Sequence, residues 1–299
     1  MTALAYRPPE RSFLGLPAHD AGPPGEARAV IIPFPLEATV SYGRGTSQGP
    51  EAIIAASPEL EFFDEEFWCE PFRRIGIATL EVAPPSQSVE TALREVEALA
   101  RLVLEAGRFP LILGGEHSIT AGAIRPVAAR FPGLVVLQID AHADLRDSYL
   151  GSPFSHASAM RRVLDHQGVS LVSLGIRAIS AEEIPFLEAN RHRIHMHFAK
   201  DKHGWSLDGI MAPLAGRPVY LTFDVDGLDA SLMPATGTPE PGGLFFDEAV
   251  DVIRAAARAG TIVGADVVEL APIPGLHACD FTAAKLAYKI IAHALLART

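Results

Sequence analysis

Two apolar runs in the sequence lead directly into acidic residues. Residues 135–139 are followed by Asp140, His142 and Asp144, and residues 219–223 are followed by Asp224 and Asp226. Side chains of an extended segment alternate between its two faces, so ligand-type residues two positions apart share a face. Carboxylates gathered beside apolar strands repel one another and are costly to bury unless they are protonated, paired with bases or bound to metal. Of these three states, metal binding fits the pattern best.

A third apolar run, residues 111–113, has the same design and is followed by two glycines, Glu116 and His117. The four aspartates together carry a charge of about −4, which two divalent cations would cancel. Oxygen ligands with a little imidazole favour Mn²⁺, and two metals about 3.5–4 Å apart can activate a water molecule for hydrolysis. We therefore expect a hydrolytic site with two manganese ions, and its candidate ligands are His117, Asp140, His142, Asp144, Asp224 and Asp226.

The elements that position these residues alternate between strand and helix. Hydrophobic periodicity predicts strands at 29–34, 109–113, 134–140, 170–174, 193–198, 218–225 and 261–268, and helices at 50–57, 89–105, 118–130, 156–165, 181–189, 206–213, 247–259 and 280–297. Such alternation predicts an α/β fold in which a mainly parallel sheet lies between two helical layers. Ligands of open parallel sheets bind beyond the carboxyl ends of the strands, and all three ligand-bearing runs end there.

Composition narrows the classes of partner. With 299 residues and 48% apolar residues, the chain can form one large globular domain. A net charge of −11 without a block of Lys and Arg argues against nucleic acid or an anionic membrane as a partner, and it suits a small cationic substrate. Only Cys69 and Cys279 are present, so we expect neither a disulfide framework nor a thiolate zinc site.

The beginning of the chain does not have the layout of a secretory signal. Residues 1–28 contain several prolines and scattered charges, and we expect them to form an irregular N-terminal arm. No stretch reaches the roughly 18 uninterrupted apolar residues of a membrane-spanning helix. We therefore expect a cytoplasmic protein.

Four segments together resemble the signatures of the ureohydrolase (arginase/agmatinase) family. They are residues 114–118, 140–144, 224–229 and 237–243, and their order, spacing and residue identities all agree with the family pattern. The resemblance implies an arginase/deacetylase-like catalytic domain over residues 29–299. Residues 144–151, with the segments that follow them at 155–157 and 160–162, are most similar to the agmatinase branch.

The resemblance also implies a role for each candidate residue. One manganese would bind His117, Asp140, Asp144 and Asp224, and the other His142, Asp140, Asp224 and Asp226. A hydroxide between the ions would attack the guanidinium carbon while Asp144 orients it. Glu269 corresponds to the family's guanidinium-binding glutamate, because a carboxylate can hold a planar guanidinium through two parallel hydrogen bonds. His156 corresponds to the proton-shuttling histidine, which serves the leaving amine or regenerates hydroxide.

Each of these roles has a plainer alternative. The ligand cluster could be a structural metal site or a salt-bridge network, Glu269 could cap a helix, and His156 could make only local hydrogen bonds. Glu116 is a candidate for orienting a metal-bound imidazole, as carboxylates near metal ligands usually do. At the level of the whole protein, the alternatives are a single-zinc amidohydrolase of the deacetylase type and a binding homologue without catalysis.

Agmatine is the favoured substrate, and its hydrolysis gives putrescine and urea. Arginases hold the α-amino and α-carboxylate groups of arginine with an asparagine pattern that residues 145–152 lack. Guanidinobutyrate or formiminoglutamate would need a cation at the far end of the pocket, for which Arg146 or Arg44 is a candidate. Many relatives carry Gly-x-Arg-x-Gly-Pro in the first loop, where this chain has Ser47 in place of the arginine, which bears on chain-length preference. The resemblance further implies a homo-oligomer, a trimer or a hexamer.

Overall fold

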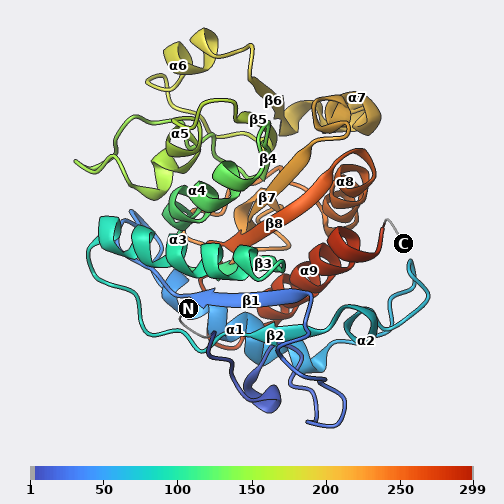
Figure 1. Cartoon of the computed structure of the whole chain (residues 1–299). Coiled ribbons are helices and arrows are strands. Elements are labelled where there is room, and N and C mark those ends of the chain that lie inside the picture. The colour runs from blue at the N-terminus through green and yellow to red at the C-terminus, as the bar shows by residue number, and fades with distance from the viewer. Residues whose placement is uncertain (1–3, 298–299) are drawn as a thin grey trace.

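The computed structural model describes residues 4–297 and contains one sheet of eight strands, all paired in parallel (Figure 1). The strand order across the sheet is β2-β1-β3-β8-β7-β4-β5-β6. The strands are β1 (Ala29–Phe34), β2 (Ile77–Thr79), β3 (Phe109–Gly114), β4 (Val135–Ile139), β5 (Ser170–Ile176), β6 (Ile194–Phe198), β7 (Pro218–Asp224) and β8 (Thr261–Val268).

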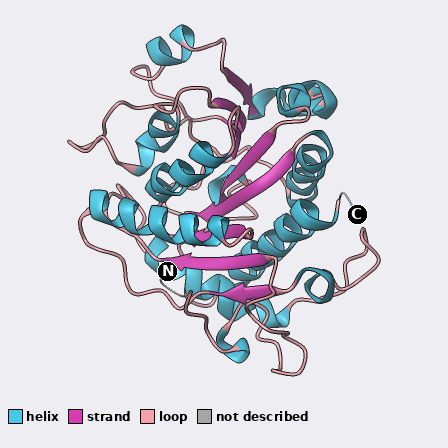
Figure 2. Cartoon of the chain, viewed as in Figure 1, coloured by secondary structure: helices cyan, strands magenta, loops and turns pink. Residues whose placement is uncertain are grey.

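Helices cover both faces of this sheet, which confirms the predicted three-layer α/β/α fold (Figure 2). The helices α3, α4 and α5 pack on one face, and α8 and α9 pack on the other. The helices are α1 (Gly49–Ala56), α2 (Pro71–Ile75), α3 (Val89–Glu105), α4 (Thr120–Arg130), α5 (Ala159–Val163), α6 (Ile184–Ala189), α7 (Leu207–Met211), α8 (Phe246–Ala259) and α9 (His277–Leu296).

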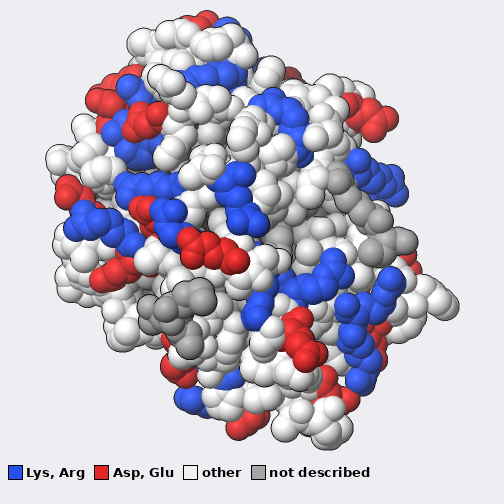
Figure 3. All heavy atoms as spheres, in the orientation of Figure 1, with Lys and Arg blue, Asp and Glu red and all other residues white. Residues whose placement is uncertain are grey.

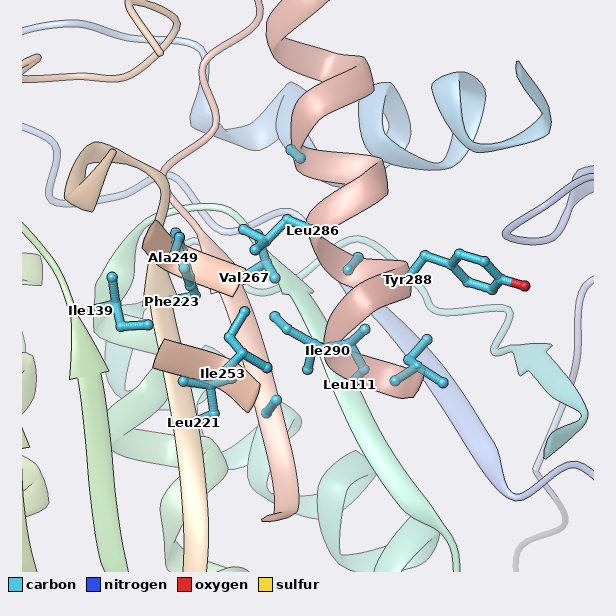
Figure 4. Close-up of a cluster of buried hydrophobic side chains, with 14 of the residues drawn as sticks. Leu111, Ile139, Leu221, Phe223, Ala249, Ile253, Val267, Leu286, Tyr288 and Ile290 are labelled. Carbon is cyan, nitrogen blue, oxygen red and sulfur yellow. The ribbon is translucent and has the colours of Figure 1, made fainter. Parts of the chain in front are cut away.

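Alternation along the strands produces two separate cores. Leu111 and Leu221 face α8 and α9, where they meet Ile253, Leu286 and Ile290 (Figure 4). Their sequence neighbours on the strands point to the opposite core, beneath α3 and α4. Burying each large apolar side chain contributes about 1.5–3 kcal/mol, so both cores hold the sheet rigid. A rigid sheet fixes the positions of the loops at its carboxyl edge.

Several predicted boundaries were wrong, mostly because local hydrogen bonds end or delay a helix. The helix predicted at 181–189 begins only at Ile184, because residues 180–183 form a turn in which the backbone N–H of Glu183 donates to the carbonyl of Ser180 at 3.1 Å. The helix predicted at 156–165 is a short 3₁₀ turn followed by α5. The three-residue β2 and the short α2 carry no periodic signal and were not predicted.

The N-terminal stretch packs against the domain. Phe13 and Leu14 are buried in the core shared with α9, and the backbone N–H of Phe13 donates to Oγ1 of Thr79 on β2 at 2.9 Å. Residues 1–3 of the predicted arm and residues 298–299 of the predicted catalytic domain lie outside the described residues. We retain the division at residue 29 as a proposal, in which the arm covers one edge of the sheet.

The visible surface mixes both signs of charge (Figure 3). Lys and Arg lie among Asp and Glu over the face shown, without one sign dominating it. None of the described helices combines the length and apolar character needed to span a membrane.

Candidate metal centre

The predicted metal ligands and Glu269 meet at the carboxyl ends of four neighbouring strands in the middle of the sheet, β3, β8, β7 and β4. His117 follows β3, the Asp140 segment follows β4, Asp224 ends β7, and Glu269 follows β8. Segments that are far apart in the sequence therefore supply one site. His117, His142, Asp144, Asp224, Asp226, His156 and Glu269 all line the same pocket.

One group of ligands surrounds His117. Its Nδ1 atom lies 3.0 Å from Oδ2 of Asp144, 3.2 Å from Oδ2 of Asp140 and 3.3 Å from Oδ2 of Asp224. All four side chains are buried. The ligand atoms of His117, Asp140 and Asp224 lie within 4.8 Å of one another, which fits ligands around one ion with metal–ligand bonds of about 2.1 Å, and Asp144 approaches this group through its contact with Nδ1.

A second group surrounds His142. Its Nδ1 atom lies 2.9 Å from Oδ2 of Asp226 and 3.7 Å from Oδ1 of Asp140. Asp140 thus directs one oxygen to each group, which supports its predicted bridging role. Asp224 lies with His117, while its Oδ1 accepts the backbone N–H of Asp226 at 2.9 Å.

The hydrogen bonds behind His117 show that this site fits a cation. Thr222 donates its hydroxyl to Oδ1 of Asp266 at 2.6 Å, so its oxygen accepts from Nε2–H of His117 at 2.8 Å. The neutral imidazole then directs the Nδ1 lone pair at three carboxylate oxygens. This buried Nδ1 atom makes no hydrogen bond among the described residues. Four converging lone pairs are stabilised by a metal ion or by a proton on the imidazole.

Without metal, the charges of the clustered side chains shift one another's pKa values. Burial alone would lower the pKa of His142, but Asp226 and Asp140 raise it to about 12. The pKa of His117 is likewise raised well above its ordinary value by Asp140, Asp144 and Asp224, against the effect of burial. Burial and the charge of Asp140 raise the pKa of Asp144 to about 7. Metal ions binding here would displace the protons of both imidazoles.

Further polar residues support the ligands, and they were not predicted. Gln138 donates from Nε2 to Oδ2 of Asp140 at 2.8 Å and accepts from the hydroxyl of Ser173 at 2.7 Å. Asp266 accepts from Thr120 and Tyr220 as well as from Thr222. The available signal was the placement of a polar residue inside an apolar strand, as with Gln138 in β4 and Asp266 in β8.

Two site residues have a backbone conformation that L-amino acids rarely adopt. The φ angle is +53° at Asp144 and +66° at Glu269. A non-glycine residue in this region is strained by about 1–3 kcal/mol and is held there by the structure around it. At Glu269 the backbone N–H donates to the carbonyl of Gly115 at 2.8 Å, which ties the end of β8 to the loop after β3.

The carboxylate of Glu269 is buried in the pocket wall. Its Oε1 atom accepts the backbone N–H of His117 at 2.6 Å. Burial raises the pKa of Glu269 to about 8, because few donors compensate the loss of water around its charge. A cation bound in the pocket would favour the charged form. This placement supports the predicted role of Glu269 as a guanidinium ligand.

His156 lines the same pocket from a 3₁₀ turn, and Ser155 caps this turn by accepting the N–H of Ala157. Its ring meets the ring of Tyr149 edge-on, with centroids 5.9 Å apart. Its Nδ1 atom lies 3.1 Å from Oγ1 of Thr39. Burial lowers the pKa of His156 below its ordinary value.

Glu116 does not orient a metal ligand, which corrects the role considered for it. Its carboxylate contacts the loop after β1, where it accepts the backbone N–H groups of Ala38 and Thr39, each at 2.6 Å. The group that orients the imidazole of His117 is instead Thr222, backed by Asp266.

A sequence model of the arginase family matches residues 27–296. The chain belongs to the arginase family. It is 38% identical over 278 residues to the N(1)-aminopropylagmatine ureohydrolase of Synechocystis sp., covering 90% of this chain and 89% of that one. It is 36% identical over 254 residues to an agmatinase of Bacillus cereus, covering 83% and 85% of the two chains. The crystal structure of an agmatine ureohydrolase of Thermoplasma volcanium superposes with a TM-score of 0.84 at 32% identity, covering 95% and 94%.

Glu37 holds the first loop, residues 43–49, in which Ser47 stands where many relatives carry arginine. Glu37 accepts the backbone N–H groups of Gly45 and Ser47 at 3.1 and 3.0 Å and the hydroxyl of Ser47 at 2.9 Å. The loop is therefore a turn around the carboxylate of Glu37. Arg44 is exposed and does not line the pocket, whereas Arg146 lines it and is paired with Glu182 at 2.7 Å.

Proposed function

We propose that this arginase-family protein hydrolyses agmatine to putrescine and urea. One observation carries the proposal. Two imidazole–carboxylate groups, which have Asp140 in common, lie beside the carboxylate of Glu269 in one pocket. The first feature suits a pair of divalent cations, and the second suits a planar cation. A guanidinium substrate placed between them would have its carbon beside the metal centre.

Manganese is the metal that we propose for both groups, because the ligands are mostly oxygen atoms with one imidazole nitrogen each. Two such ions would lower the pKa of a shared water molecule and thereby supply the nucleophile. His117, Asp140, Asp144 and Asp224 would hold one ion, and His142, Asp226 and the other oxygen of Asp140 the second. Asp224 also belongs to the second ion in our proposal.

The chain's own residues would carry the remaining tasks. Glu269 binds and orients the guanidinium, which fixes the carbon for attack. Asp144 accepts a hydrogen bond from the attacking water. Addition of water to the carbon is followed by cleavage of the bond to the substituted nitrogen, and that nitrogen leaves as an amine once it gains a proton. His156, on the same pocket wall as Tyr149, is placed to deliver that proton.

A second candidate substrate is N(1)-aminopropylagmatine, the compound in the name of the 38%-identical Synechocystis relative. The pocket mouth is formed by Ser41, Tyr42 and Thr238 together with Arg146 and Tyr149. Tyr42 is highly exposed, so a longer substrate tail has room to extend past it. Arg146 lines the pocket but is paired with the exposed Glu182, so a substrate carboxylate such as that of guanidinobutyrate or arginine would have to replace this partner.

The test is urea release from the manganese-loaded protein with agmatine, N(1)-aminopropylagmatine, arginine and 4-guanidinobutyrate, compared by kcat/KM. We expect one of the two amines to be preferred and the metal-free protein to be inactive. Absence of urea with all four would refute the proposal. Metal analysis separates the alternatives, because two manganese ions per chain support the ureohydrolase and one zinc supports a deacetylase-type enzyme. A binding homologue would hold metal without turnover.

We also propose that the protein is a cytoplasmic homo-oligomer, either a trimer or a hexamer, as the family resemblance implies. Light scattering of the full-length protein gives the number of chains. Cell fractionation followed by immunodetection gives the compartment.

A further inference from the structure

Glu116 is surrounded by hydrogen-bond donors. Its Oε2 atom accepts the N–H groups of Ala38 and Thr39, and its Oε1 atom accepts the hydroxyls of Thr39 and Ser118 at 2.7 and 2.5 Å. The residue is fully buried. Four donors around one carboxyl group fit its ionised form, which accepts only. Glu116 has no part in the metal groups, so this network serves another purpose.

The hydroxyl of Thr39 connects Glu116 to His156. A hydroxyl has one hydrogen, and that of Thr39 is donated to the carboxylate of Glu116. The oxygen of Thr39 must therefore accept from its other two partners. These are the backbone N–H of His156 at 3.0 Å and the Nδ1 atom of the same residue at 3.1 Å. Nδ1 can make this contact only as a donor, so it carries a hydrogen.

We propose that Glu116 and Thr39 form a positioning relay that holds the neutral imidazole of His156 in its Nδ1–H tautomer. The lone pair is then on Nε2, which lies on the side of the ring away from Thr39 and is free to face the pocket. Among the described residues, Nε2 makes no hydrogen bond, and His156 lines the pocket beside Tyr149. Nε2 is the atom that takes a proton and returns it, while Nδ1 stays anchored.

The surroundings of His156 support a group that exchanges protons. Burial favours its neutral form, the charge of Glu116 favours the protonated form, and the imidazoles His117 and His142 oppose protonation when they are charged. The ring of Tyr149 packs edge-on against that of His156, and Cζ of Arg146 lies over the face of Tyr149, 5.0 Å from its ring centroid. Through Thr39, the buried negative charge of Glu116 stabilises the protonated form of His156. The two charged groups do not touch, so they do not form an ion pair that would hold the proton on His156.

The tautomer can be measured independently of activity. Nitrogen-15 NMR of sedimented full-length protein labelled at histidine, with His156→Asn used for assignment, distinguishes a protonated Nδ1 from a protonated Nε2. We expect Nδ1–H in the wild type and in Thr39→Ser, which keeps the hydroxyl. In Thr39→Val we expect the hydrogen to move wholly or partly to Nε2. Ser118→Ala removes a different donor from Glu116 and should leave the tautomer unchanged.

Kinetics then test the function of the relay, and this step rests on the proposed ureohydrolase activity. In Thr39→Val we expect kcat to fall by about tenfold or more with KM within about twofold, an altered pH profile of kcat, and restoration by Thr39→Ser. An Nε2–H wild type, or an unchanged tautomer in Thr39→Val, would overturn the relay whether or not urea forms. Unchanged kcat and pH profile in a Thr39→Val enzyme with a shifted tautomer would overturn its catalytic part. Failure of the wild type to release urea refutes the proposed function and leaves the NMR result to decide the tautomer.

Discussion

Replacing Glu269 by glutamine tests how the pocket selects a guanidinium. The side-chain amide introduced by Glu269→Gln would keep an acceptor for the N–H of His117, which lies 2.6 Å from Oε1 in the wild type, so the fold around the site should survive. The variant loses the negative charge and turns an N–H donor toward the substrate cation. A hydrogen bond to a charged group contributes about 1.5–3 kcal/mol, which corresponds to a fall of about 10- to 150-fold in kcat/KM.

The pH dependence of the same variant provides a second check. Burial raises the pKa of Glu269 to about 8 in the metal-free protein, and bound manganese ions would lower it from there. Substrate binding requires the charged form. We therefore expect the KM of the wild type to fall as the pH rises toward about 8, and the KM of Glu269→Gln to change much less over that range.

The assay is urea release from agmatine at matched manganese content, verified by elemental analysis. Glu182→Gln is the matched control, because it removes the same charge from an exposed side chain that pairs with Arg146 at the pocket rim. We expect this control to stay within about twofold of the wild type, as exposed ion pairs contribute little. Equal kcat/KM for Glu269→Gln and the wild type, with metal content and pH profile unchanged, would show that Glu269 does not bind the substrate.

Three further predictions concern the metal centre and the loop beside it. Thr222→Val leaves Nε2–H of His117 without its acceptor, so manganese affinity should fall about 10- to 100-fold, measured by competition with a chelator; unaltered affinity would contradict the orienting role. Because the carboxylates raise the pKa of His117 and that of His142, both imidazoles are protonated at neutral pH in the metal-free protein. Manganese should displace these protons and should therefore bind more weakly as the pH falls. Calorimetry in buffers of different ionisation enthalpy should show the release of protons on binding. Gly115→Ala would place a Cβ atom 2.0 Å from the carbonyl oxygen of Leu36. The free energy of unfolding, measured by thermal unfolding, should fall by about 1–3 kcal/mol, and elemental analysis should find less bound manganese. A melting curve like that of the wild type would show that the loop shifts to make room for the methyl group.

The sequence predicted the sheet and the location of the site because both depend on simple patterns. Apolar runs of strand length alternate with amphipathic segments, and each of the three ligand-bearing runs ends at the sheet edge where Asp140, His117 and Asp224 meet. The spacing did not predict how the ligands divide, because residues 140–144 lie beyond the strand, where Asp144 joins His117 and His142 joins Asp226. The ligands converge because the strands are parallel and because β3, β7 and β4 lie close together in the sheet.

The supporting residues could not be predicted in the same way. The contact of Asp266 with Thr222, and that of Glu116 with Thr39, depend on strand order and loop path, which periodicity does not determine. The same holds for the positive φ angles of Asp144 and Glu269, since a positive φ at a residue other than glycine has no sequence signature. Helix boundaries were missed where a turn precedes the helix, as before α6, where the backbone N–H of Glu183 donates to the carbonyl of Ser180.

The strand order has a consequence for how the protein is made. β3 and β4 follow each other in the chain, yet β8 and β7 are inserted between them in the sheet. A nascent chain leaving the ribosome therefore carries His117 and Asp140 long before the strands that complete their surroundings exist. Fragments that lack the last two strands cannot assemble the site, and manganese capture must await synthesis of nearly the whole polypeptide.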